Sequence, residues 1–139
     1  MYSDIKLYTT LWRESNAVYE EWAKKRGISY CELLVMLSLY EGEAKTQKDI
    51  CSQWILPKQT VHTILKSFVE RSWVVLSADE KDRRNKKIRL TPQGESQICS
   101  VAEELREHEL RVWNGLGRER AALLIEVTAQ YNRLFKEGL

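Results

Sequence analysis

Basic side chains gather in one quarter of the sequence, and their chemistry is the binding of anions. Residues 57–91 contain nine Lys or Arg side chains and four acids, which gives a net charge of +5. Because the whole chain carries +2, the remaining residues carry −3. Six of the nine residues 81–89 are basic. A basic segment on an otherwise mildly acidic chain indicates contact with nucleic-acid phosphates.

A second group of polar residues lies just upstream of the most basic stretch. Over residues 57–71, four apolar side chains recur at helical spacing, and the first three turns contain no acid. A merely solvated helix face more often mixes Glu with Lys four residues apart. The polar residues are short or planar groups that can donate and accept at base edges, flanked by lysines suited to phosphates. They are Lys58, Gln59, Thr60, His62, Thr63 and Lys66.

The residues that most often bind metals or act as nucleophiles are few and scattered. Cys31, Cys51 and Cys99 are an odd number with no CxxC spacing, which predicts reduced thiols in a cytoplasmic protein. Cys31 begins a predicted helix, where a thiolate is favoured, so redox sensing stays an alternative to a structural role. His62 and His108 lie on different predicted elements. We therefore predict no metal, no cofactor and no enzymatic activity.

Length and composition fit one domain without a membrane segment. The chain has 139 residues, of which 43% are hydrophobic and 30% charged. The apolar run Leu33–Leu37 spans five residues, far short of the roughly 20 that cross a bilayer. Residues 1–4 begin neither a basic nor an apolar segment, so no secretory signal is predicted.

Two helices are predicted before the basic region. Apolar residues recur at three- and four-residue steps over residues 4–26. A second helix begins at Ser29, with Glu32 completing a capping box, and Glu41-Gly42-Glu43 end it. Its apolar run 33–37 has no polar face, so we expect it to be buried on most sides.

The basic region is predicted to be a helix-turn-helix followed by a hairpin. Thr46 and Asp49 open a short helix, and Pro57 is the expected first residue of the next. Residues 73–76 and 87–90 have the composition of strands and flank a basic loop. A hairpin with a basic tip after a helix-turn-helix is a wing.

Two long helices are predicted to complete the chain. Thr91-Pro92 start a helix that runs to about Asn114, and Gly115-Leu116-Gly117 separate it from the last one. These helices and the first carry more apolar surface than the short helices and the hairpin can cover, so we predict a dimer. The predicted fold class is mainly α with a small β-hairpin wing.

Three motifs in this order resemble those of the MarR family of bacterial transcription regulators. Asp82-Arg83-Arg84 is similar to the family's Asp-x-Arg wing signature, and Leu90-Thr91-Pro92-Gln93-Gly94 resembles its Leu-Thr-x-x-Gly junction. Residues 57–61 resemble the start of a family recognition helix. Many members have Gly where this chain has Ser72, so a less relaxed turn is expected there. Trp73 replaces a smaller apolar residue.

The resemblance covers nearly the whole chain and implies a dimeric DNA-binding protein. It implies a single domain over residues 1–139, with a winged helix-turn-helix lobe at 30–91 and dimerisation helices at 1–27 and 92–139. Family members bind pseudo-palindromic DNA and often release it when a small ligand or an oxidant acts. The peroxide-sensing branch keeps its reactive Cys in the first helix, and this chain has no Cys before residue 31. The family's ligand pocket could here be lined by aromatic residues such as Tyr8, Trp12, Tyr19 or Trp113, which also suit a core.

The sequence and the resemblance together predict a repressor that binds double-stranded DNA and is released by a small-molecule effector. The wing contributes Arg83, Arg84 and Lys86, and Arg84 is expected in the minor groove. By the resemblance, Asp82 orients the Arg84 side chain. Two alternatives stay open: a thiol-redox-responsive regulator of the same fold, and a winged-helix module that binds another protein.

Overall fold

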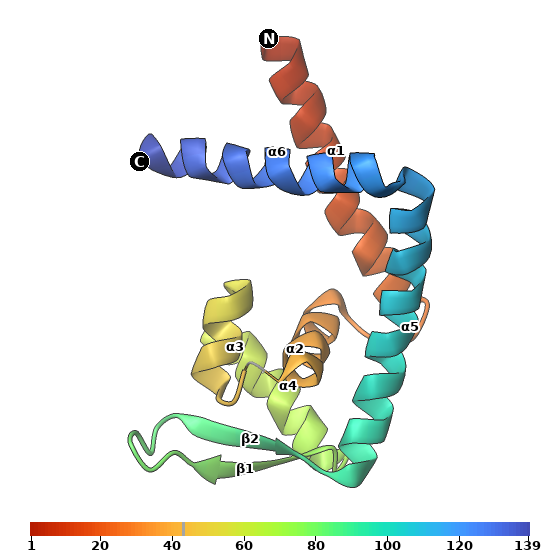
Figure 1. Cartoon of the computed structure of the whole chain (residues 1–139). Helices are drawn as coiled ribbons and strands as arrows, with labels where there is room; N and C mark the ends of the chain where they lie inside the picture. Colours follow the sequence, from red (N-terminus) through yellow and green to blue (C-terminus); the bar gives the residue numbers. More distant parts are fainter. Residues whose placement is uncertain (43) are drawn as a thin grey trace. The chain divides into compact units, whose positions relative to one another are not determined.

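The computed structural model describes residues 1–42 and 44–139, so the expectation that Glu43 helps to end the second helix lies outside it. These residues form helices and one two-stranded antiparallel sheet (Figure 1). The helices are α1 (Tyr2–Lys24), α2 (Tyr30–Glu41), α3 (Gln47–Trp54), α4 (Lys58–Glu70), α5 (Pro92–Leu116) and α6 (Arg118–Glu137). The strands are β1 (Val74–Ala78) and β2 (Lys86–Leu90). The predicted fold class is confirmed.

The chain divides into two compact units, residues 1–100 and 101–139. The first contains α1 to α4, the hairpin and the start of α5, and the second contains the rest of α5 and α6. Among the described helices, none is both long and apolar enough to cross a membrane.

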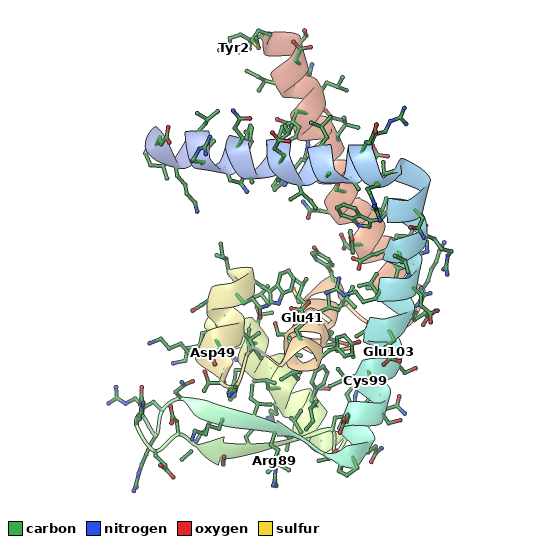
Figure 2. All side chains as sticks on the ribbon, in the orientation of Figure 1. Tyr2, Glu41, Asp49, Arg89, Cys99 and Glu103 are labelled. Atoms are coloured by element: carbon green, nitrogen blue, oxygen red, sulfur yellow. The ribbon has the colours of Figure 1, made fainter. Side chains whose placement is uncertain are left out.

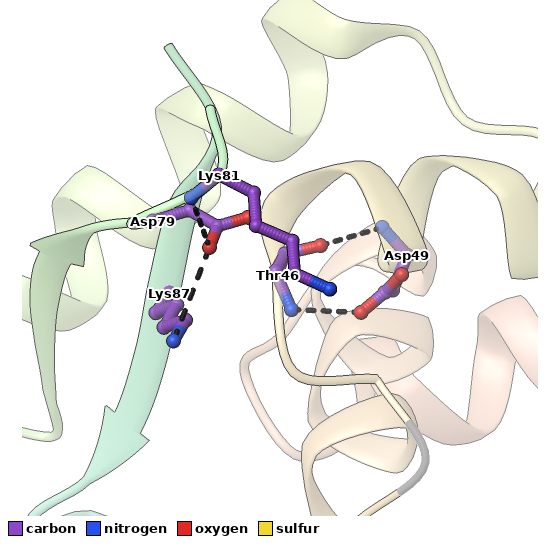
Figure 3. Close-up of polar contacts among 5 residues, drawn as sticks. All are labelled: Thr46, Asp49, Asp79, Lys81 and Lys87. Atoms are coloured by element: carbon purple, nitrogen blue, oxygen red, sulfur yellow. Dashed lines mark hydrogen bonds and ion pairs between the residues drawn. The ribbon is translucent and has the colours of Figure 1, made fainter. Parts of the chain in front are cut away.

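Local side-chain chemistry accounts for where the short helices begin. The Ser29 hydroxyl accepts a hydrogen bond from the Glu32 backbone N–H at 3.1 Å, which is one half of the predicted capping box. At α3 both halves form (Figure 3): the Asp49 N–H donates to the Thr46 hydroxyl, and the Thr46 N–H donates to the Asp49 carboxylate. Pro57 is the residue before α4 rather than its first residue, since its backbone is extended, with ψ 139°.

The core of the first unit is built around α2. Seven consecutive residues of α2, from Leu33 to Leu39, are buried, which confirms the expectation from the apolar run. The α4 residues Val61, Ile64, Leu65 and Phe68 are also buried, so the predicted apolar face of that helix is confirmed. In Figure 1, α2, α3 and α4 gather together and the hairpin runs along one side of them. The sequence region 46–70 therefore forms a helix-turn-helix resting on α2.

The hairpin is longer than predicted and pairs with one more segment. Val74 pairs with Leu90 and Ala78 with Lys86, so the first strand begins one residue later than expected and ends two residues later. The Ile88 N–H donates to the Lys45 carbonyl at 2.9 Å, and Thr46 forms a bridge with Lys87. A single bridge before α3 leaves no periodic signal in the sequence, and it fixes the wing to the helix-turn-helix.

Candidate nucleic-acid interface

Helix α4 buries one face and presents a polar face to solvent. Five of its six predicted contact residues are exposed, namely Lys58, Gln59, His62, Thr63 and Lys66. Thr60 is half-buried, so less of its side chain is available for contact. The exposed face is uninterrupted because the apolar residues at 61, 64, 65 and 68 all turn inward.

Hydrogen bonds along α4 use part of the capacity of its polar groups. The Thr63 hydroxyl donates to the Gln59 carbonyl at 3.0 Å and accepts from the Gln59 side-chain amide at 3.5 Å, so one Thr63 lone pair and the Gln59 side-chain oxygen remain available as acceptors. The start of α4 has no side-chain cap and no acid in its first turn. Its first backbone N–H groups and the helix dipole therefore favour an anion.

The wing loop is ordered by its own acids. Asp79 accepts a hydrogen bond from the Lys81 N–H at 3.3 Å and pairs with the Lys87 ammonium at 3.9 Å (Figure 3). Asp82 Oδ1 accepts from the Arg84 backbone N–H at 3.0 Å, and the Asn85 N–H donates to the Asp82 carbonyl at 3.0 Å. These contacts close a tight turn at residues 82–85.

The structure places the Asp82 carboxylate against the backbone of Arg84, and the orienting role expected of Asp82 stays a prediction. Within the part of the chain that the structure describes, Asp82 contacts the backbone of Arg84 and forms no ion pair with its guanidinium. The two residues are only two positions apart, and an Asx turn uses the carboxylate on the nearer N–H. Asp82 thus shapes the loop, and the Arg84 side chain stays free of it. Arg83, Arg84 and Lys86 are all exposed.

The structure shows basic residues that sequence reasoning did not select. Lys48, in the first turn of α3, is exposed, and its backbone N–H donates to the Asn85 side-chain oxygen of the wing loop at 3.3 Å. Arg89 is also exposed and projects from the outer side of the hairpin (Figure 2). The capping box at Thr46 predicts α3 itself, but the contact between α3 and the wing is visible only in the fold.

The thiols and the metal-binding residue types form no evident reactive centre. Within the described residues, none of the three cysteines forms a disulfide, and all three are half-buried. Cys31 is the second residue of α2, and its neighbour Tyr30 has a pKa raised by burial and by the Cys31 charge. Among residues 1–42 and 44–139, no three His, Cys, Asp or Glu side chains form a group able to hold a metal.

The aromatic residues suggested for an effector pocket differ in exposure. Tyr8 and Trp12 on α1 are 46% and 58% exposed, and Tyr19 is half-buried. Trp113 on α5 is 37% exposed. Their role as pocket residues stays a prediction.

Comparison with known proteins agrees with this geometry. Residues 28–94 match a family described as a winged helix DNA-binding domain, close to the lobe predicted at 30–91. The HTH-type transcriptional regulator Hpr of Bacillus cytotoxicus is 26% identical over 110 residues, 79% of this chain and 60% of that protein. The chain thus spans about 60% of the length of that relative.

Two solved structures share the fold over almost the whole chain. A MarR family regulator from Neisseria meningitidis has a TM-score of 0.82 at 23% identity, covering 97% of this chain and 95% of that one. The MepR–DNA complex of S. aureus has a TM-score of 0.70 at 19% identity, covering 100% and 99%. The resemblance inferred from the three motifs is confirmed. Residues 28–94 are similar to winged helix DNA-binding domains, and the chain has the fold of MarR family regulators.

Proposed function

We propose that the protein is a homodimeric transcription regulator that binds a pseudo-palindromic site in double-stranded DNA. The observation that carries the proposal is that an exposed polar helix face and a basic wing loop occur in the same lobe. An exposed polar face on α4 lies in a lobe whose wing loop carries the exposed cations Arg83, Arg84 and Lys86. A recognition helix suits the major groove, and loop arginines suit the narrow, electronegative minor groove beside it.

Different side chains of α4 are suited to contact bases and phosphates. Gln59 and Thr63 carry groups that can donate or accept at base edges, and base contacts supply sequence specificity. Lys58 and Lys66 supply charge for phosphates, which fixes the position of the helix without reading the sequence. His62 and Thr60 complete the proposed contact set on the same helix.

The dimer is supported by apolar surface that one chain leaves uncovered. Helix α6 has no buried residue, and seven of its apolar side chains are between 46% and 62% exposed. They are Leu123, Leu124, Ile125, Val127, Tyr131, Leu134 and Phe135. Helix α1 exposes further large apolar residues, among them Leu11 and Trp12. Apolar faces of this extent on amphipathic helices suit a second copy of the chain, which would also give the DNA site its two-fold symmetry.

Regulation follows from the resemblance and is part of the proposal. We expect a repressor that a small ligand releases, with the exposed aromatic residues of α1 as candidates for its contacts. Binding to chromosomal DNA would place the protein in the cytoplasm, in keeping with three cysteines that form no disulfide among the described residues. We expect no catalytic activity, because a DNA-binding surface of this kind needs none.

Two substitutions test the division between wing and recognition helix. Arg84→Ala should weaken binding to specific and scrambled duplexes alike, by about 1–3 kcal/mol per protomer, because the minor-groove contact reads shape and potential. Gln59→Ala should lower the ratio of specific to scrambled affinity, because a base-edge contact is lost. The measurement is a fluorescence anisotropy titration on a duplex selected by the parent protein from genomic fragments and on its scrambled version.

The controls separate lost contacts from lost structure. Lys24→Gln removes one exposed charge from the end of α1 and should leave both affinities unchanged. Each variant must unfold at the temperature of the parent, since the loop at residues 82–85 could also be disturbed. If Arg84→Ala binds both duplexes like the parent, the wing only keeps the hairpin soluble and the minor-groove assignment is wrong.

A further inference from the structure

A cavity of about 260 Å³ lies where the wing loop meets the first turns of α3 and α4. Each of these three elements contributes one cation to its wall: Lys48 from α3, Lys58 from α4 and Arg84 from the loop. The other lining residues are Gln47, Cys51, Asp82 and Asn85. The cavity is open on one side, so a group carried by a larger molecule could enter it.

The charges around this cavity are unbalanced. Three cations face one carboxylate, that of Asp82, which already accepts the Arg84 backbone N–H. Among the described residues, the side chains of Lys48, Lys58 and Arg84 have no ion-pair or hydrogen-bond partner. Like charges brought together repel one another, so an anion in their midst is favoured.

Hydrogen bonds hold the walls of the cavity together. The Asn85 side-chain oxygen accepts the Lys48 N–H at 3.3 Å and fixes the wing loop to α3. The Gln47 side-chain amide donates to the Lys58 carbonyl at 3.3 Å and fixes α3 to the start of α4. Because the Lys48 N–H is already used, positive charge in the cavity comes from the side chains rather than from the end of α3. The backbone segments that carry the three cations are therefore held together before any partner arrives.

The geometry of duplex DNA indicates which anion would occupy the cavity. On the proposed function, α4 enters a major groove and the wing enters the adjacent minor groove. A sugar-phosphate strand separates the two grooves at every point, so one strand must pass between α4 and the wing. The cavity lies between these two elements and has the charge that a phosphate needs.

We propose that this cavity seats one DNA backbone phosphate, held by Lys48 and Lys58, at the point where the Arg84 side chain leaves the wing loop for the minor groove. The proposal rests on the proposed function and adds Lys48, a residue outside both the recognition helix and the wing. It also assigns Asn85 and Gln47 as positioning residues, which hold the wing loop, α3 and the start of α4 around the phosphate without contacting a base.

The first test measures the contribution of Lys48 to affinity and to salt dependence. Lys48→Gln removes the charge and leaves a polar side chain that is one bond shorter. It should weaken binding to specific and scrambled duplexes equally, by roughly tenfold for the dimer, because a phosphate contact carries no sequence information. The slope of log K against log salt should become less steep by about one per protomer. Lys24→Gln is the charge-matched control and should change neither quantity.

The second test locates the phosphate. Methylphosphonate groups, which are uncharged, replace the phosphates of the duplex one at a time, and each duplex is titrated with the parent and with Lys48→Gln. At the phosphate that occupies the cavity, the neutral group should clearly weaken DNA binding by the parent and only slightly weaken DNA binding by Lys48→Gln. At other phosphates the two losses should add. Additive losses at every phosphate, or parent-like binding by Lys48→Gln, would overturn the proposal.

The outcomes also separate this proposal from the proposed function. If Arg84→Ala and Gln59→Ala change DNA binding while Lys48→Gln does not, only the cavity assignment fails. If the parent does not bind duplex DNA, the proposed function fails as well. A titration with inorganic phosphate tests whether the cavity binds free phosphate instead of a phosphate of the DNA backbone. If millimolar phosphate raises the melting temperature of the parent but not of Lys48→Gln, and DNA affinity is equal in both, the cavity holds a free phosphate and the DNA assignment is overturned.

Discussion

Gly94 lies where the root of the wing meets the start of α5, and a methyl group there has no space. A Cβ atom at residue 94 would lie 1.8 Å from the Trp73 carbonyl oxygen and 2.5 Å from its carbon. Both atoms belong to the backbone, so no side-chain rotation can relieve the clash. The Trp73 carbonyl would have to move by about 1.5 Å to reach an ordinary contact distance.

The cost of that movement can be worked out from the hydrogen bonds at the junction. The Trp73 carbonyl accepts from the Thr91 N–H at 3.0 Å. It also shares the proton of the Thr91 hydroxyl, at 3.2 Å, with the Ser72 carbonyl, at 2.5 Å. The same hydroxyl caps α5 by accepting the Gly94 N–H at 3.0 Å. Loss of the Thr91 cap on α5 would cost about 1 kcal/mol, and loss of the two hydrogen bonds to the Trp73 carbonyl about 1 kcal/mol each. The higher helix propensity of Ala over Gly would return at most about 1 kcal/mol. Gly94→Ala should therefore lower the free energy of unfolding by about 2 kcal/mol.

Thermal unfolding followed by circular dichroism at one fixed protein concentration measures the effect. We expect Gly94→Ala to lower the melting temperature by about 6–8 °C and to weaken DNA binding, because the wing root shifts. Gly115→Ala is the matched control: no atom lies within 4 Å of its Cβ position, so stability should stay equal or rise. A parent-like melting temperature for Gly94→Ala would refute the steric account of this junction.

Three further predictions concern strain, pH and assembly. Ile55 is 90% exposed and adopts the left-handed conformation φ 54°, ψ 47°, which is unfavourable for a β-branched residue. Ile55→Asn should therefore raise the free energy of unfolding in urea by about 1 kcal/mol, whereas Ile55→Val, which keeps the β-branch, should not. Equal stability of the two variants would contradict the strain argument. The pKa of Asp49 is lowered, mainly by the hydrogen bond that its carboxylate accepts from the Lys45 N–H. The ionised carboxylate therefore stabilises the folded protein above about pH 4, and this stabilisation is lost as the pH falls through the pKa of Asp49 in the folded state. The difference in urea midpoint between the parent and Asp49→Asn should accordingly narrow on acidification, and a constant difference would argue against the carboxylate's role. Deletion of residues 118–139 should yield a monomer or an aggregate in sedimentation velocity, and a soluble dimer would show that α6 is not the interface.

Those parts of the fold that depend on neighbouring residues were predictable from the sequence. The Thr46 and Asp49 capping box and the buried face of α4 both follow from side chains three or four positions apart. A less relaxed turn after α4 was also expected from the resemblance, which implies Gly at many members' equivalent of Ser72, and Ser72 adopts φ 62°. Such local signals fix where elements begin and which face each one buries.

Features that depend on distant parts of the chain were not predictable. The Lys45 carbonyl accepts a hydrogen bond from the Ile88 N–H of β2, and the Lys48 N–H donates to Asn85 across 37 positions of sequence, so neither contact leaves a pattern in the sequence. The left-handed conformation of Ile55 was equally hidden, because a β-branched residue is the last expected there. The resemblance pointed to Asp82 and Arg84, but only the structure shows that the carboxylate binds a backbone N–H.

The salt dependence of binding to an operator duplex tests the central claim most directly. The proposed interface offers at least four phosphate-binding cations per protomer, among them Lys58, Lys66 and Arg84. A dimer should then show log K falling against log salt with a slope of roughly −5 to −8. Affinity that hardly changes with salt on any duplex recovered from genomic fragments would contradict the account and favour a winged-helix module that binds protein.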